Sequence, residues 1–231
     1  MARAITGDFN EFERLLRFAD NDFFNISMTF GVLNRIAGRS ELFPPLCRTE
    51  GEFLIVRNSF LVTTVIGLGR LYFGDRNSPC LPTLMQFFEN DRFVSTVREK
   101  YVGLARTRRP ELFLADQARY KAKAIDEFKK RKLELDLQWK GIVESGQIKA
   151  IGRLRNTRYA HSVVKKETGK RLKIPDLKFE DLGKVVDETD RLFAAIIILV
   201  YGAGAVSERS FSAPVDLLNA PTVWWEYGPF S

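Results

Sequence analysis

The chain has 231 residues, enough for one sizeable domain, and its 45% hydrophobic and 28% charged residues are ordinary for a soluble globular protein. Two cysteines and one histidine exclude a disulfide framework and argue against a histidine-based metal centre, so we expect no metal and no cofactor. A net charge of +7 favours a polyanionic partner. The N-terminal residues lack a signal-peptide core and the longest apolar run, residues 192–206, is short for a bilayer span. We therefore expect a cytoplasmic protein that does not enter a membrane.

Helical apolar spacing dominates the chain, and no strand pair is predicted. A short first helix, capped by Asp8 or Asn10, is expected to end at Phe18, and a second to span residues 21–37. A long helix follows over residues 50–73. Its predicted apolar face consists of Leu54, Leu61, Val65, Leu68 and Tyr72.

Glycines inside the third predicted helix, Gly67 and Gly69, would allow another backbone to approach closely. Shorter helices are expected over residues 82–90 and 93–105. The 19 phenylalanines predict an aromatic-rich core.

The second half of the chain predicts three more helices. Residues 111–145 are rich in strong helix formers and should form one long helix that Gly141 and Gly146 bend or interrupt. Further helices are expected over residues 148–161 and 176–206. We therefore expect a single helical domain over residues 1–206, followed by a tail over residues 207–231 with an aromatic cluster at Trp224, Trp225 and Tyr227.

The most informative residue is His161, the only histidine in the chain. Its ordinary pKa, about 6.5, lies near neutrality, which makes it the leading candidate for acid–base chemistry. Arg155 and Asn156 precede it by six and five positions. Two further arginines flank them, and a guanidinium stays charged and matches the oxygens of a phosphate. The pattern indicates chemistry on a phosphodiester, with additional cations at Arg153 and Arg158.

The spacing Arg-Asn, four residues, His resembles the signature of the HEPN superfamily, which is Arg, a polar residue, a short spacer and His. The segment Gly67-Leu68-Gly69-Arg70-Leu71-Tyr72 also resembles the second helix of its abortive-infection, AbiU2-like branch. The resemblance covers about residues 50–205 and implies an all-α helical bundle with long antiparallel helices, preceded here by extra N-terminal helices. It also implies a metal-independent endoribonuclease, a toxin or phage-defence effector. The catalytic residues would be Arg155, Asn156 and His161, supported by Arg158 and Tyr159.

Other interpretations stay open. At a helix C-terminus, His161 would only meet the negative end of the helix dipole. In an uninterrupted α-helix, six positions place Arg155 and His161 about 120° apart. Either the helix ends before His161, or two motifs meet across a homodimer, as the resemblance implies. The alternatives in function are a non-catalytic helical module that binds RNA or protein, and a structural protein in which Arg155 and His161 brace a helix end.

Basic residues cluster just after the motif and in residues 119–132. They are either ordinary solvated surface or a track for RNA phosphates. We expect the first cluster to bind RNA together with Arg153, through Lys165, Lys166, Lys170 and Arg171. The expected partners are therefore RNA, a second copy of the chain and, if one exists, an antitoxin protein.

Overall fold

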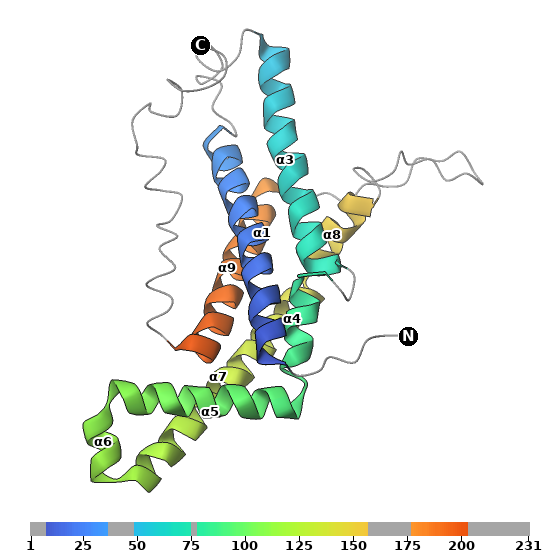
Figure 1. Ribbon diagram of the computed structural model, residues 1–231. Helices are drawn as coiled ribbons and strands as arrows, with labels where there is room; N and C mark the ends of the chain where they lie inside the picture. The colour runs from blue at the N-terminus through green and yellow to red at the C-terminus, as the bar shows by residue number, and fades with distance from the viewer. Residues whose placement is uncertain (1–7, 37–48, 75–77, 157–176, 203–231) are drawn as a thin grey trace, which may run out of the picture.

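The computed structural model describes residues 8–36, 49–74, 78–156 and 177–202. Within these ranges the chain forms eight helices and no strand, which confirms the all-helical prediction. Three long helices lie side by side: α1 (Phe9–Ile36) runs antiparallel to both α3 (Glu50–Phe73) and α9 (Phe179–Tyr201) (Figure 1). Their facing side chains belong to one hydrophobic core. The predicted tail over residues 207–231 lies outside the described residues.

The first described element is one helix, so the prediction of two helices separated near Asn21 is wrong. Buried side chains continue along one face of α1 through the predicted break, from Phe12 and Leu16 to Phe23 and Ile26. Because the intervening polar residues lie on other faces, they do not interrupt the core contacts that stabilise the helix.

Helix α3 has the predicted bounds. Its N-terminus is fixed by a capping box, in which the Thr49 hydroxyl accepts from Glu52 N at 3.2 Å and the Glu52 carboxylate accepts from Thr49 N at 3.3 Å. The predicted buried face is correct at Val65, Leu68 and Tyr72 but wrong at Leu54, which is exposed. Phe53, one residue earlier, is buried instead.

The outward face of α3 is also apolar. Ile55, Val62, Ile66 and Phe73 are spaced by seven, four and seven residues, which places them on one side of the helix. Ile55 is 68% exposed and Phe73 is 43% exposed, while the two between them are half-buried. Among the described helices, α3 alone has the length and apolar composition to cross a membrane, a test that core helices of soluble proteins also pass.

An aromatic cluster joins α1 to the next two helices, α4 (Leu81–Phe87) and α5 (Asp91–Arg108). The ring of Phe12 lies 5.4 Å from that of Phe87 and 4.7 Å from that of Phe93, centroid to centroid. Phe88 contacts both Phe12 and Phe93. The predicted aromatic core is thereby confirmed, and it fixes the N-terminal end of α1.

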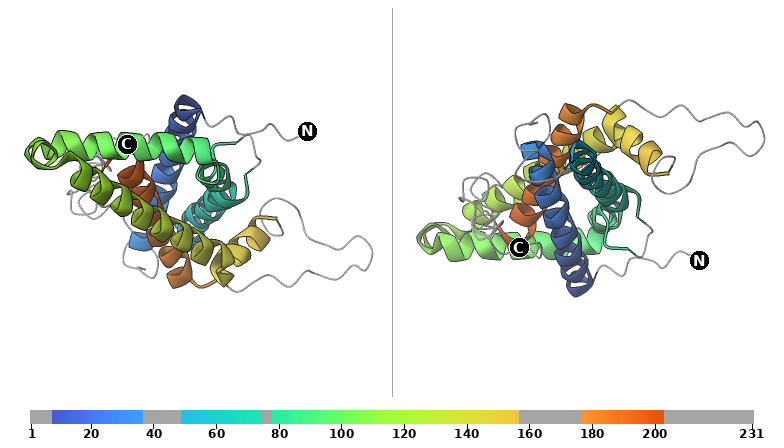
Figure 2. Two further views of the ribbon diagram at one scale, coloured as in Figure 1. Left: turned by 90° about the horizontal axis from the view of Figure 1, so that it is seen from below. Right: turned by 90° about the horizontal axis from the view of Figure 1, so that it is seen from above.

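Residues 111–145 do not form one long helix, because the chain breaks at Asp116. Helix α6 (Pro110–Ala115) ends there and α7 (Gln117–Glu144) begins, with the Asp116 carboxylate accepting from Arg119 N at 3.0 Å. Together α5, α6 and the start of α7 form a corner that projects at one end of the bundle (Figures 1 and 2). The predicted interruption near Gly146 is confirmed: α8 (Gly146–Leu154) follows directly, and Gly141 lies inside α7.

Candidate active site

The predicted motif lies at the C-terminal end of α8. The Ser145 hydroxyl caps this helix by accepting from Ile148 N at 3.2 Å. Ile148, Ile151 and Leu154 are buried and hold α8 against the bundle. The chain thus delivers Arg155 from a short, firmly packed helix.

Arg155 and Asn156 lie in a π-type turn after α8, in which Arg155 keeps helical φ and ψ of −52° and −51° and donates its N–H to Ile151 O and Gly152 O. Such turns occur mostly as single insertions, frequently at functional sites. Residues 157–161 lie outside the described residues, so the offset of about 120° between Arg155 and His161 stays a prediction.

The side chain of Arg155 extends to the C-terminal turn of α3. Its Nη1 donates to Gly69 O at 3.1 Å and to Phe73 O at 3.2 Å. The carbonyl of Phe73 is one of the last four of α3, which have no intrahelical donor, and a cation there also meets the negative end of the helix dipole. No acceptor within the described ranges takes a hydrogen bond from Nε or Nη2 of Arg155.

Two glycines make this contact possible. A Cβ at Gly69 would lie 2.5 Å from Cδ of Arg155, and one at Gly152 would lie 2.9 Å from the ring of Phe73. Gly67 plays the same part toward α1, where a Cβ would lie 2.6 Å from Cγ1 of Ile26. The glycines were predicted to admit another backbone, but the structure places side chains against them.

The α3 turn that holds Arg155 is itself fixed by Tyr72. Its hydroxyl lies 2.7 Å from Oγ1 of Thr189 on α9. Because that hydroxyl of Thr189 donates to Val185 O, Tyr72 must be the donor to Thr189. The Tyr72 ring also stacks on Trp139 of α7, with centroids 6.2 Å apart. Burial is the main cause that raises the pKa of the Tyr72 phenol above its ordinary value, so the phenol stays protonated.

The structure describes three of the predicted site residues. Arg155 follows α8 and is half-buried against α3, whereas Asn156 and Arg153 are exposed. His161 and both supporting residues, Arg158 and Tyr159, lie outside the described residues, so their placement stays a prediction. The same holds for the four predicted RNA-binding residues Lys165, Lys166, Lys170 and Arg171.

The sequence does not predict Gly69 and Tyr72 as supports of the motif. The signal that could have found them is the string Gly-Leu-Gly-Arg-Leu-Tyr at the end of α3, which resembles the family but does not by itself point to Arg155. Gly69 has no side chain, and this leaves room on the surface of α3 for the side chain of Arg155.

Comparison with known proteins adds a family assignment to this geometry. No curated protein and no solved structure matches the chain significantly. The HEPN family model described as AbiU2 matches residues 48–220, which include α3, the Arg155 turn and α9 but not α1. Since the match covers most of the chain, the protein belongs to the AbiU2 family of HEPN domains.

Proposed function

We propose that this protein is a metal-independent endoribonuclease that acts as a toxin or phage-defence effector in the cytoplasm. Family membership supports the general class, an abortive-infection HEPN domain. The observation that carries the catalytic proposal is the state of Arg155. One of its terminal nitrogens is anchored on the carbonyls of α3, and its remaining N–H groups have no acceptor within the described ranges. A guanidinium fixed in this way can present its free edge to a phosphate.

The proposed reaction needs no group beyond the chain and its RNA. A ribose 2′-hydroxyl loses its proton and its oxygen attacks the adjacent phosphorus, while the bond to the 5′-oxygen breaks and that oxygen takes up a proton. His161 is the base in the first proton transfer or the acid in the second, and water is the partner in the other. The products are a 2′,3′-cyclic phosphate and a 5′-hydroxyl. Arg155 stabilises the charge that develops on the phosphate, and Asn156 donates a hydrogen bond or orients the site. Arg158 and Tyr159 support these residues.

Binding of the substrate is assigned to the cations around the motif. Arg153 is exposed two residues before Arg155, and the lysine cluster follows the motif in sequence. Each cation that neutralises a phosphate releases a counterion, so binding should weaken as salt rises. An antitoxin protein would act by covering this surface.

We also propose that the active form is a homodimer that pairs through the outward face of α3. The stripe is exposed at its two ends, Ile55 and Phe73, and exposed apolar surface of this kind needs a partner to leave water. The stripe ends at Phe73, whose carbonyl holds Arg155 and whose ring packs on Gly152. Pairing of two such stripes would bring two motifs together.

A second interpretation is favoured by the same contacts. Arg155 fills the place of a C-terminal cap for α3, as expected if it only braces the helix. The protein would then be a non-catalytic module that binds RNA or protein. The two interpretations differ in what a lysine at this position would do.

The deciding experiment compares Arg155→Lys, Arg155→Ala and His161→Ala in an RNA-cleavage assay with EDTA present. A lysine can still donate to one carbonyl of α3 but lacks the planar fork for phosphate. We expect Arg155→Lys to keep the melting temperature of the wild type and to lose about 10²–10³ in cleavage rate. His161→Ala should lose about 10²–10⁴. If the wild-type protein leaves RNA intact and Arg155→Lys keeps the wild-type melting temperature, the result would support the interpretation that Arg155 only braces the helix.

The dimer is tested separately by light scattering. Ile55→Glu places a charge on the exposed end of the stripe and should give a monomer with reduced cleavage. The matched control is Leu133→Glu, because Leu133 is 58% exposed on α7, away from the stripe. A wild-type protein that is monomeric at micromolar concentration would contradict the dimer. If the wild-type protein is a monomer that co-sediments with lipid vesicles, the stripe would be assigned to a membrane surface.

A further inference from the structure

A cavity separate from the motif lies in the corner formed by α5, α6 and α7, closed on its inner side by the end of α9. It has a volume of about 290 Å³ and is open on one side. Figures 1 and 2 show that this corner projects at the opposite side of the bundle from α8, which carries the motif. Arg155 and Asn156, the described residues of the proposed catalytic site, do not line this cavity.

Four cationic side chains line the cavity, and one carboxylate faces them. Arg108 belongs to α5, Arg109 lies between α5 and α6, and α7 supplies Lys123 and Arg131 together with the carboxylate of Glu127. Within the described ranges, neither Arg109 nor Lys123 forms an ion pair. The excess of positive charge favours an anionic ligand.

Two of the cations are held in place. Arg131 donates from Nη2 and Nε to Oε1 of Glu127, at 2.9 and 3.2 Å, and from Nε to the hydroxyl of Tyr101 at 3.1 Å. These hydrogen bonds lower the pKa of Glu127 and keep the pair charged. The guanidinium of Arg108 lies against Gly202, where a Cβ would be 3.0 Å from its Nη2. Gly202 also has φ +81°, a backbone conformation that favours glycine. Both the contact with Arg108 and the backbone therefore require a residue without a side chain.

The remaining wall is aromatic and aliphatic. The rings of Tyr101, Phe113 and Tyr120 line it together with Leu104 and Ile198. Tyr101 and Phe113 are buried, so the ring available for stacking is Tyr120, which is half-buried and contacts Phe113. Planar rings beside cations are the surfaces on which nucleic-acid bases stack while their phosphates are neutralised.

We propose that this cavity binds a nucleotide, with the phosphate on Arg108, Arg109 and Lys123 and the base against the aromatic wall. The ligand is either a free mononucleotide or the 5′-phosphorylated end of a strand. Both present a phosphate and one base to the cavity. The site is separate from the proposed ribonuclease site and does not depend on its activity.

The test measures binding to the full-length protein by calorimetry. The probes are adenosine 5′-monophosphate, adenosine, inorganic phosphate and a 5′-phosphorylated deoxydinucleotide, which has no 2′-hydroxyl to support cleavage. Adenosine 5′-monophosphate should bind at least tenfold more tightly than adenosine or phosphate, because each of these can make only one half of the interactions. Tighter binding of the dinucleotide than of the mononucleotide assigns the cavity to a strand end, and the reverse order assigns it to a free nucleotide.

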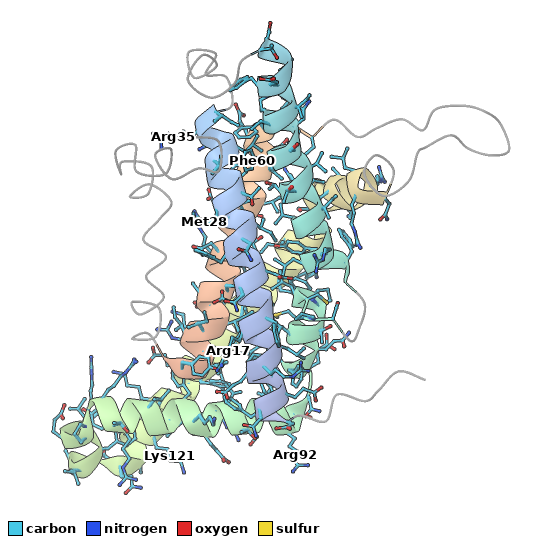
Figure 3. The ribbon with its side chains drawn as sticks, turned by 45° about the horizontal axis from the view of Figure 1, so that its top comes forward. Arg17, Met28, Arg35, Phe60, Arg92 and Lys121 are labelled. Carbon is cyan, nitrogen blue, oxygen red and sulfur yellow. The ribbon has the colours of Figure 1, made fainter. Side chains whose placement is uncertain are left out.

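Variants localise the binding. Arg109→Gln and Lys123→Gln each remove one exposed charge from the cavity and should weaken binding about five- to tenfold. Ala105→Phe keeps every charge but fills the cavity, and should abolish binding. The matched controls are Arg92→Gln and Lys121→Gln, which remove exposed cations of α5 and α7 that do not line the cavity (Figure 3). They should bind as the wild type does.

Several results would overturn the proposal. One is the absence of binding at about 1 mM nucleotide. Another is equal weakening by Arg92→Gln and Arg109→Gln, which would show general electrostatic attraction. Unchanged binding in a folded Ala105→Phe variant would place the ligand elsewhere. Arg155→Ala should bind the nucleotide normally, so loss of cleavage in that variant and loss of binding here are independent results.

Discussion

Replacing Gly69 by alanine tests whether α3 positions Arg155. The new Cβ would lie 2.5 Å from Cδ of Arg155 and 3.2 Å from its Cβ and Cγ. Carbon atoms prefer about 3.5–4.0 Å, so the side chain must move by about 1 Å. Because the conflict involves the base of the side chain as well as Cδ, rotation of the guanidinium alone cannot relieve it. The hydrogen bonds to Gly69 O and Phe73 O would be broken or lengthened.

The expected effect on stability is small. Alanine in place of glycine inside a helix stabilises by about 1 kcal/mol. Overpacking at Arg155 costs about 1–3 kcal/mol. The net change in the free energy of unfolding should therefore be a loss of about 0–2 kcal/mol. Cleavage should fall much further, about 10²-fold, since a displacement of about 1 Å suffices for a loss of that size.

Gly67→Ala is the matched control. It creates a similar conflict, 2.6 Å from Cγ1 of Ile26, but with an apolar side chain of α1. Its loss of stability should be similar and its cleavage rate close to that of the wild type.

A double-mutant cycle in urea keeps the test independent of activity. In an Arg155→Ala background most of the conflict at Gly69 is gone, so Gly69→Ala should stabilise by about 1 kcal/mol. The coupling between the two sites should then be about 1–3 kcal/mol. Additive effects of Gly69→Ala and Arg155→Ala on stability would refute the claim that Gly69 acts through Arg155.

Other parts of the molecule give three more predictions. Tyr72→Phe removes the buried hydrogen bond to Thr189 and should cost about 1 kcal/mol near neutral pH. Because the pKa of Tyr72 is raised above 10.0, its stabilising effect is fully present below pH 10 and is lost as the pH rises beyond that value; Tyr72→Phe should flatten the alkaline fall of stability in urea titrations. Asp116→Ala removes the cap of α7 and should lower stability by about 1 kcal/mol, with Asp116→Asn close to the wild type in thermal unfolding. Replacing Lys165, Lys166 and Lys170 with glutamine should reduce the slope of log Kd for RNA against log salt by about 0.7 for each phosphate that is no longer neutralised. An unchanged slope would show that these lysines do not contact RNA.

The helical class, the bounds of α3 and the residues of the motif follow from the order of the amino acids alone. Apolar spacing at three and four residues is a local property, so it can be read without the fold. The capping box at Thr49 is equally local, which is why α3 begins where expected. The single histidine and the Arg-Asn pair before it are visible in the chain alone, and so is the family that they indicate.

Where helices continue or break depends on how distant parts of the chain pack together. The polar residues near Asn21 look like a boundary, but α1 runs through them because its buried face is continuous. Asp116 lies in a run of helix formers, yet the chain turns there because α6 and α7 pack against each other at the corner.

The partners of Arg155 and the corner cavity were also beyond the sequence. Arg155 meets Gly69 across a separation of 86 residues, and the cavity joins α5, α7 and α9. Spacing along a chain carries no information about which carbonyl a distant guanidinium reaches. Packing of whole helices determines that choice, because the missing side chain of Gly69 leaves room for Arg155 only once α8 lies against α3.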